Sequence, residues 1–522
     1  MVDVLISAAR IADGLGNPLF NADLAIEQGV MRILRSDQTV SAVERIDATG
    51  LVLAPGFIDI HAHNDLVAAS GVYLDDKVLQ GVTTEVNGNC GFSPFPITDR
   101  NRHLQNELLS IIAPGKWQGD WTSWSQYADT VRHCGSPTNI VGQVGHGALR
   151  SAVLEMASRD PTTHELREMQ HLLDRCLEDG ASGLSFGLMY SPSCFAKEKE
   201  IAALSEVVTA HQAFVSVHLR SYDQHHLIPS MREMLDAVCG AGARLLLSHL
   251  APSGVSAASA VDPMLELVEA AVADGLDVAF DRYPYEHAFT CLSLLFPKWL
   301  LAGDQESVTR RLGEAATEAR VAAELDSFIA DIGYPNIRLF GSEYGPWNGL
   351  SLTELGARLD MIPSVATITA LKMHGGSAPI TMQLTDMSVQ ERLVQHPLCM
   401  IGSDGVPCRG GTHPRTFGCF ARVVGPVVRR GVLTLPQAIH KMTGQPAQWL
   451  GLADRGRIQD GVPADLVLFD ADTIADESSF ADPYAPPAGI HFVFVGGHAV
   501  VRNGKATALR PGKMLSPRRL YS

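Results

Sequence analysis

Apolar and polar segments alternate through the centre of the chain in an order that predicts strands separated by helices. Short apolar runs typical of buried strands lie near residues 56–61, 82–86, 138–144, 183–187, 214–218, 244–249, 276–280 and 398–403. In the clearest helical pattern, Asp160 and Pro161 precede an apolar face from Leu166 to Leu177, and Gly180 follows it. Similar helices are predicted at 198–211, 228–239 and 262–274.

Eight strand–helix units are typical of one particular α/β architecture, the closed (β/α)8 TIM barrel. A doubly wound open sheet is the alternative. No glycine-rich phosphate-binding loop of the expected form follows the first predicted strand, which favours the barrel.

The two ends of the chain have a different, strand-rich pattern. Short strands are predicted at 2–8, 22–27 and 31–34, and again at 464–470 and 491–501. We therefore expect a small β-sandwich domain built from residues 1–54 and 455–522. The barrel would then occupy residues 55–454.

Residues 286–344, between the seventh and eighth predicted strands, are too many for a plain crossover. Their pattern reads as helical and amphipathic. We expect an inserted lid over the barrel mouth, with an ordinary surface elaboration as the alternative.

Composition narrows the classes of function. The 522 residues carry a formal net charge of −16 and no basic cluster, which argues against nucleic acid as a partner. No apolar run reaches the roughly 18 residues that a membrane-spanning helix needs. The nine cysteines are scattered and the first ten residues do not read as a signal peptide, so we expect reduced thiols in the cytoplasm. The oligomeric state is not indicated.

Candidate metal ligands follow the predicted strands. His61 and His63 are two residues apart at the end of the first strand, so both imidazoles point to the same face. Imidazole nitrogens are common ligands of divalent metals. Further candidates follow the second, fifth, sixth and eighth strands: Cys90, His218, His249 and Asp404. Each alone could be a core or capping residue, but six at one rim predict a metal site.

This set of motifs resembles the amidohydrolase superfamily, and most closely its N-acyl-D-amino-acid deacylase (D-aminoacylase) branch. The resemblance runs over nearly the whole chain. The matching stretches are Pro-Gly-Phe-Ile-Asp-Ile-His-Ala-His at 55–63, Gly-Asn-Cys-Gly at 88–91, Gly-Leu-Ser-Phe-Gly-Leu-Met-Tyr-Ser-Pro at 183–192, Tyr-Pro-Tyr at 283–285, Gly-Ser-Asp-Gly at 402–405, His-Pro-Arg at 413–415 and Gly-Arg-Ile-Gln-Asp-Gly-Val-Pro-Ala-Asp-Leu at 456–466.

The resemblance implies a zinc-dependent hydrolase of amide C–N bonds whose partner is a small N-acyl compound. It implies one tight zinc site formed by Cys90, His218 and His249. A weaker second site would combine His61 and His63 with the shared Cys90 and Asp404. Water activated by zinc would be the nucleophile, and Asp404 would act as general base and then as general acid.

The resemblance also implies substrate-binding roles for Tyr190, Tyr283 and Arg415. His146, at the predicted third strand, is left unassigned. One departure stands out: the family usually has Ser-His-His-Lys after strand six, whereas this chain has Ser-His-Leu-Ala at 248–251. Because Ala251 cannot pair with a substrate carboxylate, a simple N-acyl-D-amino acid is a less suitable substrate, unless Arg415, the two tyrosines or Arg220 compensate.

Two other functions remain open at this point. The chain could hydrolyse a cyclic amide or an N-acyl amine without a carboxylate, or it could be a non-catalytic relative. The complete ligand set argues against the last, because a silent relative has no need to keep Asp404 beside the metal residues.

Overall fold

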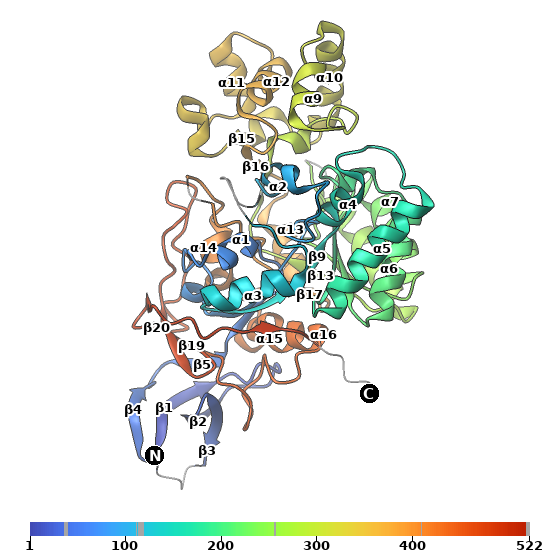
Figure 1. Ribbon diagram of the computed structural model, residues 1–522. Helices are drawn as coiled ribbons and strands as arrows, with labels where there is room; N and C mark the ends of the chain where they lie inside the picture. The colour runs from blue at the N-terminus through green and yellow to red at the C-terminus, as the bar shows by residue number, and fades with distance from the viewer. Residues whose placement is uncertain (36–39, 111, 113–118, 255–256, 409, 518–522) are drawn as a thin grey trace.

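The computed structural model describes residues 1–35, 40–110, 112, 119–254, 257–408 and 410–517, and the chain is an α/β protein. Figure 1 shows three regions. A sheet containing the first strands lies at the bottom, parallel strands with their helices fill the middle, and a mostly helical segment lies at the top. Among the described residues no helix is both long and apolar enough to cross a membrane.

Parallel strands form the middle region, in two sheets. The first has the order β17-β13-β12-β11-β10-β9. Its members are β9 (Val144–Gly145), β10 (Gly183–Gly187), β11 (Phe214–His218), β12 (Arg244–Leu247), β13 (Val278–Arg282) and β17 (Cys399–Ile401). The second has the order β22-β8-β7-β6, with β6 (Phe57–Asp59), β7 (Val82–Asn87), β8 (Asn139–Gly142) and β22 (Met514–Leu515).

Backbone contacts join these two sheets at both sides. One residue, Gln143, separates β8 from β9. On the other side Ala62, after β6, forms a parallel bridge with Gly405, after β17. The amide of Asp404 also donates to the carbonyl of His61 at 2.8 Å. The segments that follow β6 and β17 therefore lie side by side.

The strand predictions for this region are confirmed to within a few residues, because its strands are buried on both faces and so read as apolar runs. The predicted helices also form, as α5 (Thr163–Glu178), α6 (Glu198–Ala210), α7 (Leu227–Met234) and α8 (Val261–Ala273). Two boundaries differ. The N-cap of α5 is Thr162 and not Asp160, because Thr162 and Glu165 form a reciprocal capping box. The helix predicted at 228–239 ends as an α-helix at Met234 and continues as a π-helix over Leu235–Cys239.

Other helices cover the strands and connect them. They are α1 (Asp65–Ser70), α2 (Gln105–Leu109), α3 (Trp124–Cys134), α4 (His146–Leu154), α13 (Met387–Gln395), α14 (Arg415–Arg422), α15 (Leu435–Met442) and α16 (Gly444–Leu450).

Strands from both chain ends share one nine-stranded sheet. The N-terminal strands are β1 (Val2–Ile11), β2 (Phe20–Glu27), β3 (Val30–Leu34), β4 (Ala42–Asp47) and β5 (Val52–Pro55), and the C-terminal ones are β18 (Leu466–Phe469), β19 (Ile490–Val495), β20 (His498–Arg502) and β21 (Lys505–Ala506). The two sets join where β5 pairs antiparallel with β18. The final strand, β22, leaves this sheet and pairs with β8 of the middle region.

The segment after β13 forms a unit with its own apolar core. A three-stranded sheet orders its strands β14-β16-β15, with bounds β14 (His287–Cys291), β15 (Ile337–Leu339) and β16 (Pro379–Gln383). Its helices are α9 (Gln305–Arg311), α10 (Ala315–Ile329), α11 (Leu352–Leu359) and α12 (Pro363–His374). The helical prediction for residues 286–344 is confirmed at α9 and α10 but wrong at β14 and β15. β14 pairs with a strand nearly a hundred residues away, which a local pattern does not reveal. The predicted insertion corresponds to the first part of this unit.

Candidate metal centre

The six predicted ligand residues all lie at or just beyond the carboxyl ends of parallel strands, and all are buried. His61 and His63 follow β6, Cys90 follows β7, His218 ends β11, His249 follows β12 and Asp404 follows β17. Their side chains meet in two overlapping groups that share Cys90. Within each group the candidate ligand atoms lie within 4.8 Å of one another. The structure therefore brings together every metal ligand that the sequence suggested.

The backbone at three of these residues is left-handed. The φ angles are 54° at Cys90, 37° at His249 and 48° at Asp404. Such angles are uncommon for residues other than glycine, and they persist where the surroundings enforce them. The Cys90 turn is closely packed, because a Cβ added to Gly187 would lie 1.9 Å from the carbonyl oxygen of Cys90. The turns after these strands therefore fix the directions in which the side chains of Cys90, His249 and Asp404 point.

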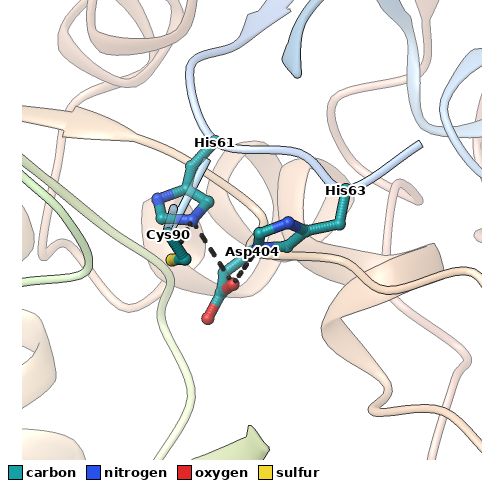
Figure 2. A group of neighbouring side chains, drawn as sticks. All are labelled: His61, His63, Cys90 and Asp404. Carbon is teal, nitrogen blue, oxygen red and sulfur yellow. Dashed lines mark hydrogen bonds and ion pairs between the residues drawn. The ribbon is translucent and has the colours of Figure 1, made fainter. Parts of the chain in front are cut away.

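Figure 2 shows the first group, in which the imidazoles of His61 and His63 converge on the carboxylate of Asp404. Asp404 Oδ1 lies 3.1 Å from His63 Nε2 and 3.5 Å from His61 Nε2. His61 Nε2 is also 3.3 Å from Cys90 Sγ. These distances show that the four candidate ligand atoms surround one common position.

The second group consists of Cys90, His218 and His249. Cys90 Sγ lies 3.6 Å from His249 Nε2, which in turn lies 3.0 Å from His218 Nδ1. Two ligand atoms that bind one zinc ion at roughly 2.0–2.3 Å in tetrahedral geometry lie about 3.3–3.7 Å apart. The donor atoms and their spacing therefore fit a zinc ion.

The protonation of these residues also suits a metal. Burial lowers the pKa of His218 to about 3 and holds that of His249 well below its usual range, so both imidazoles are neutral donors. Burial raises the pKa of the Cys90 thiol to about 11. A thiolate at that position calls for a strong positive charge beside it, as a bound metal ion supplies.

Arg415 holds Asp404 in its ionised form. Its Nη2 donates to Asp404 Oδ2 at 2.7 Å, and its Nε donates to the Asp404 carbonyl at 2.8 Å. Burial would raise the pKa of Asp404, but the Arg415 guanidinium keeps that pKa well below its usual range. Arg415 does not line the cavity above the ligands, although its Nη1 is buried and without a partner among the described residues.

Asp281, on β13, is a contributor that the sequence reasoning missed. Its Oδ2 accepts from His61 Nδ1 at 3.2 Å, which leaves His61 Nε2 facing the cluster. Its Oδ1 accepts from the backbone amide of His249 at 2.9 Å. A carboxylate at the end of an otherwise apolar predicted strand is the signal that could have identified it.

A cavity opens above the ligands, and its walls are mostly apolar. Tyr283 and Tyr190 both line it, and the Tyr190 hydroxyl lies 3.0 Å from Thr290 Oγ1. Ala251 lines it as well, at the place where the family usually has lysine. The apolar part of the wall comprises Phe92, Met189, Phe289, Leu294, Phe328, Ile332, Met382, Leu384 and Val406.

The remaining candidates lie elsewhere. Arg220 does not line this cavity and is paired with Glu233 at 2.7 Å. His146 is buried beside Glu200 and Ser193, at 3.0 Å and 2.7 Å respectively, and it belongs to neither group of ligands.

Comparison with known proteins agrees with this geometry. Residues 44–285 and 345–501 match the Amidohydrolase family. The chain is 33% identical to N-acyl-D-glutamate deacylase of Alcaligenes xylosoxydans xylosoxydans, over 98% of this chain and 96% of that protein.

Two solved structures match as well. The crystal structure of a D-aminoacylase has a TM-score of 0.84 and 29% identity, covering 99% of this chain and 100% of that one. An N-acyl-D-glutamate deacylase from Bordetella bronchiseptica, complexed with zinc and a phosphonate inhibitor, has a TM-score of 0.84 and 30% identity, covering 99% of each chain. The chain therefore belongs to the amidohydrolase family, within its branch of N-acyl-D-amino-acid deacylases.

Proposed function

We propose that this chain is a zinc-dependent hydrolase of amide C–N bonds that deacylates N-acyl-D-amino acids or related N-acyl compounds. One observation carries the proposal. Two groups of metal-ligand atoms share Cys90 at the floor of an apolar cavity, and an ionised Asp404 belongs to one of them.

Zinc is the ion that the ligands favour, because thiolate and imidazole together are typical of zinc sites. We assign Cys90, His218 and His249 to a tight site. His61 and His63, with Cys90 and Asp404, would form a weaker second one. The zinc in the Bordetella bronchiseptica relative supports this choice of metal.

When bound, zinc polarises the scissile carbonyl and lowers the pKa of a water molecule. Asp404 accepts a proton as the water oxygen bonds to the carbonyl carbon. It then delivers that proton to the nitrogen as the C–N bond breaks, so that a carboxylic acid and an amine leave. Arg415 keeps Asp404 ionised before the first transfer.

Substrate binding falls to Tyr190 and Tyr283 in the cavity wall. Arg415 would contribute through Nη1, its one nitrogen without a partner among the described residues. A substrate carboxylate beside the scissile bond is costly to bury unless a cation pairs with it. Ala251 cannot supply that cation. Substrates that are larger, or uncharged next to the amide, suit this cavity better.

We further infer that the two parallel sheets close into one (β/α)8 barrel over residues 55–454. The contacts at Gln143 and between Ala62 and Gly405 support this closure. The end sheet would form the predicted β-sandwich, and the unit after β13 would act as a lid. We propose a cytoplasmic location, which the nine free cysteines favour.

Hydrolysis assays on the zinc-loaded protein test the function. Matched N-acyl-D- and N-acyl-L-amino acids, their primary amides and cyclic amides should be compared by release of the amine. Turnover of N-acyl-D compounds, with the amides ahead of the free acids, is expected. Turnover of cyclic amides alone would contradict deacylation, and no turnover of any of them would indicate a non-catalytic relative.

A further inference from the structure

The cavity above the metal ligands continues into a second, wider cleft. Residues that line both spaces are Met189, Ser221, Asp223, Leu294, Phe328 and Asp331. The inner cavity has a volume of about 100 Å³ and the outer cleft about 1020 Å³. The outer cleft lies between α7 on one side and α10 with the preceding residues 294–298 on the other. A substrate that extends beyond the inner cavity would therefore pass between these shared residues.

An apolar waist separates the two spaces. It is formed by Met189, Leu294 and Phe328, each of which faces both spaces. Phe328 lies on α10 and is 42% exposed. A chain of methylene groups passing the waist would cover this ring and remove apolar surface from water.

The acidic side chains of the outer cleft all have partners. Asp223 lies 2.9 Å from His226, and Glu233 lies 2.7 Å from Arg220. Glu324 lies 2.8 Å from Arg320, and Asp331 accepts from Gln224 at 3.2 Å. These carboxylates are not free to bind a ligand cation.

Lys298 differs from them, because its ammonium group has no hydrogen-bond or ion-pair partner among the described residues. It is half-buried in the wall of the outer cleft. Burial, reinforced by the charge of Arg220, lowers the pKa of Lys298. The charge of Glu233 opposes this shift without pairing directly with Lys298. A partly desolvated cation that lacks a direct ion pair is costly, and an anion placed beside it relieves that cost.

The cations of the inner cavity are engaged with protein groups. Ala251 provides none, and Arg415 pairs with Asp404. Arg282 in the cavity wall donates to the carbonyls of His249 and Tyr285 at 2.9 Å and 3.4 Å. Among the described residues, and beyond the single free nitrogen of Arg415, the unpaired positive charge on the substrate's path is therefore that of Lys298 in the outer cleft.

We propose that Lys298 binds a carboxylate that the substrate carries at a distance from its scissile amide, across an apolar spacer lying in the waist. The inference rests on the proposed deacylase function and narrows its substrate class. The preferred compounds are N-acyl amines with a remote carboxylate, located either on the amine half or on the acyl half.

Two series of test substrates distinguish a carboxylate on the amine half from one on the acyl half. The first contains N-acetylglycine, N-acetyl-4-aminobutyrate and N-acetyl-6-aminohexanoate, each as free acid and as primary amide. The second contains succinyl and adipoyl derivatives of D-leucinamide, each with a free or an amidated terminal carboxyl group. The ratio of kcat/KM for the acid to kcat/KM for the matched amide should rise with spacer length to about tenfold in one of the two series. The series that shows the rise identifies the half of the substrate that carries the carboxylate.

Variants assign the effect to one side chain. Lys298→Met keeps the length but removes the charge, so it should abolish the preference for the long acid through KM and leave the amide unchanged. Lys298→Arg should retain the preference. Lys372→Met is the matched control, because Lys372 lies in the same unit but is paired with Glu318 at 2.9 Å.

Two results would overturn the inference. One is an acid-to-amide ratio at or below one for every spacer in both series, and the other is a preference that survives in Lys298→Met. Turnover of the neutral amides tests the proposed function separately. If the zinc-loaded wild type hydrolyses none of the amides or acids, the deacylase assignment fails and this inference fails with it.

Discussion

At the scale of single residues, Asp404 is both the proposed proton acceptor and the partner of a buried arginine. It faces His63 at 3.1 Å and Arg415 at 2.7 Å. Asp404→Asn keeps the size of the side chain and removes the proton acceptor. We expect kcat to fall by a factor of about 10² or more, with a smaller change in KM. Steady-state kinetics on zinc-loaded protein measure this, and turnover near that of the wild type would exclude Asp404 as the proton shuttle.

Ala251 determines how well the cavity binds a substrate carboxylate next to the scissile bond. Ala251→Lys should raise kcat/KM for free N-acyl-D-amino acids and leave matched amides unchanged, because the new ammonium group can pair with the carboxylate. Ala251→Met controls for the added volume. The wild type itself should be weak on these acids. A wild-type kcat/KM of about 10⁴ M⁻¹s⁻¹ or more on them would show that a lysine is not needed there.

The sequence predicts the metal ligands, because their residue types and their positions after predicted strands are enough to identify them. His61, His63 and Asp404 could be placed because they follow apolar strands. Asp281 was missed, since its function depends on which side chains surround it. The pairing of Arg415 with Asp404 was also missed, because sequence spacing does not reveal a contact between separate elements.

At the scale of elements, β10 supports the turn that carries Cys90. Ser185 Oγ donates to the Gly88 carbonyl and accepts from the Gly91 amide at 2.9 Å. Ser185→Ala removes both contacts, so zinc affinity should fall by about 10- to 100-fold, as for other groups that orient ligands. Competition with a chelator measures this.

The control is Ser182→Ala, at the residue that immediately precedes β10. Ser182 Oγ is buried and has no partner among the described residues, so its loss should leave zinc affinity unchanged. Equal zinc affinity in the two variants would show that Ser185 does not hold the Cys90 turn.

Elements with local signals were predictable, and those that depend on distant partners were not. The middle strands were visible as apolar runs bounded by turns. β14 was read as helical because its five residues pair only with β16, far along the chain. The same reason explains why β22 could not be placed beside β8.

At the scale of the whole molecule, buried carboxyl groups link stability to pH. Burial raises the pKa of Glu85 to about 8, and its Oε1 accepts from Thr138 at 2.7 Å. In an unfolded chain a glutamate titrates near roughly 4.3. Between these values the folded chain binds a proton that the unfolded chain has lost, so the free energy of unfolding falls as pH rises from about 5 to 8.

Glu85→Gln should flatten this slope, because a neutral amide does not titrate. Denaturant unfolding at several pH values and constant zinc loading measures it. Glu165→Gln is the control: Arg159 and Thr162 lower the pKa of Glu165, so that carboxylate is ionised in both states over this range. An unchanged slope in Glu85→Gln would contradict the link.

The metal content of the purified protein tests the central claim most directly. Elemental analysis of the wild type and of Cys90→Ala should find about one tightly held zinc per wild-type chain, because one thiolate and two imidazoles bind that ion well. Cys90→Ala should lose it, since both ligand groups share Cys90. Stoichiometric zinc in Cys90→Ala, or full wild-type activity in a strong chelator with no transition metal present, would contradict the account.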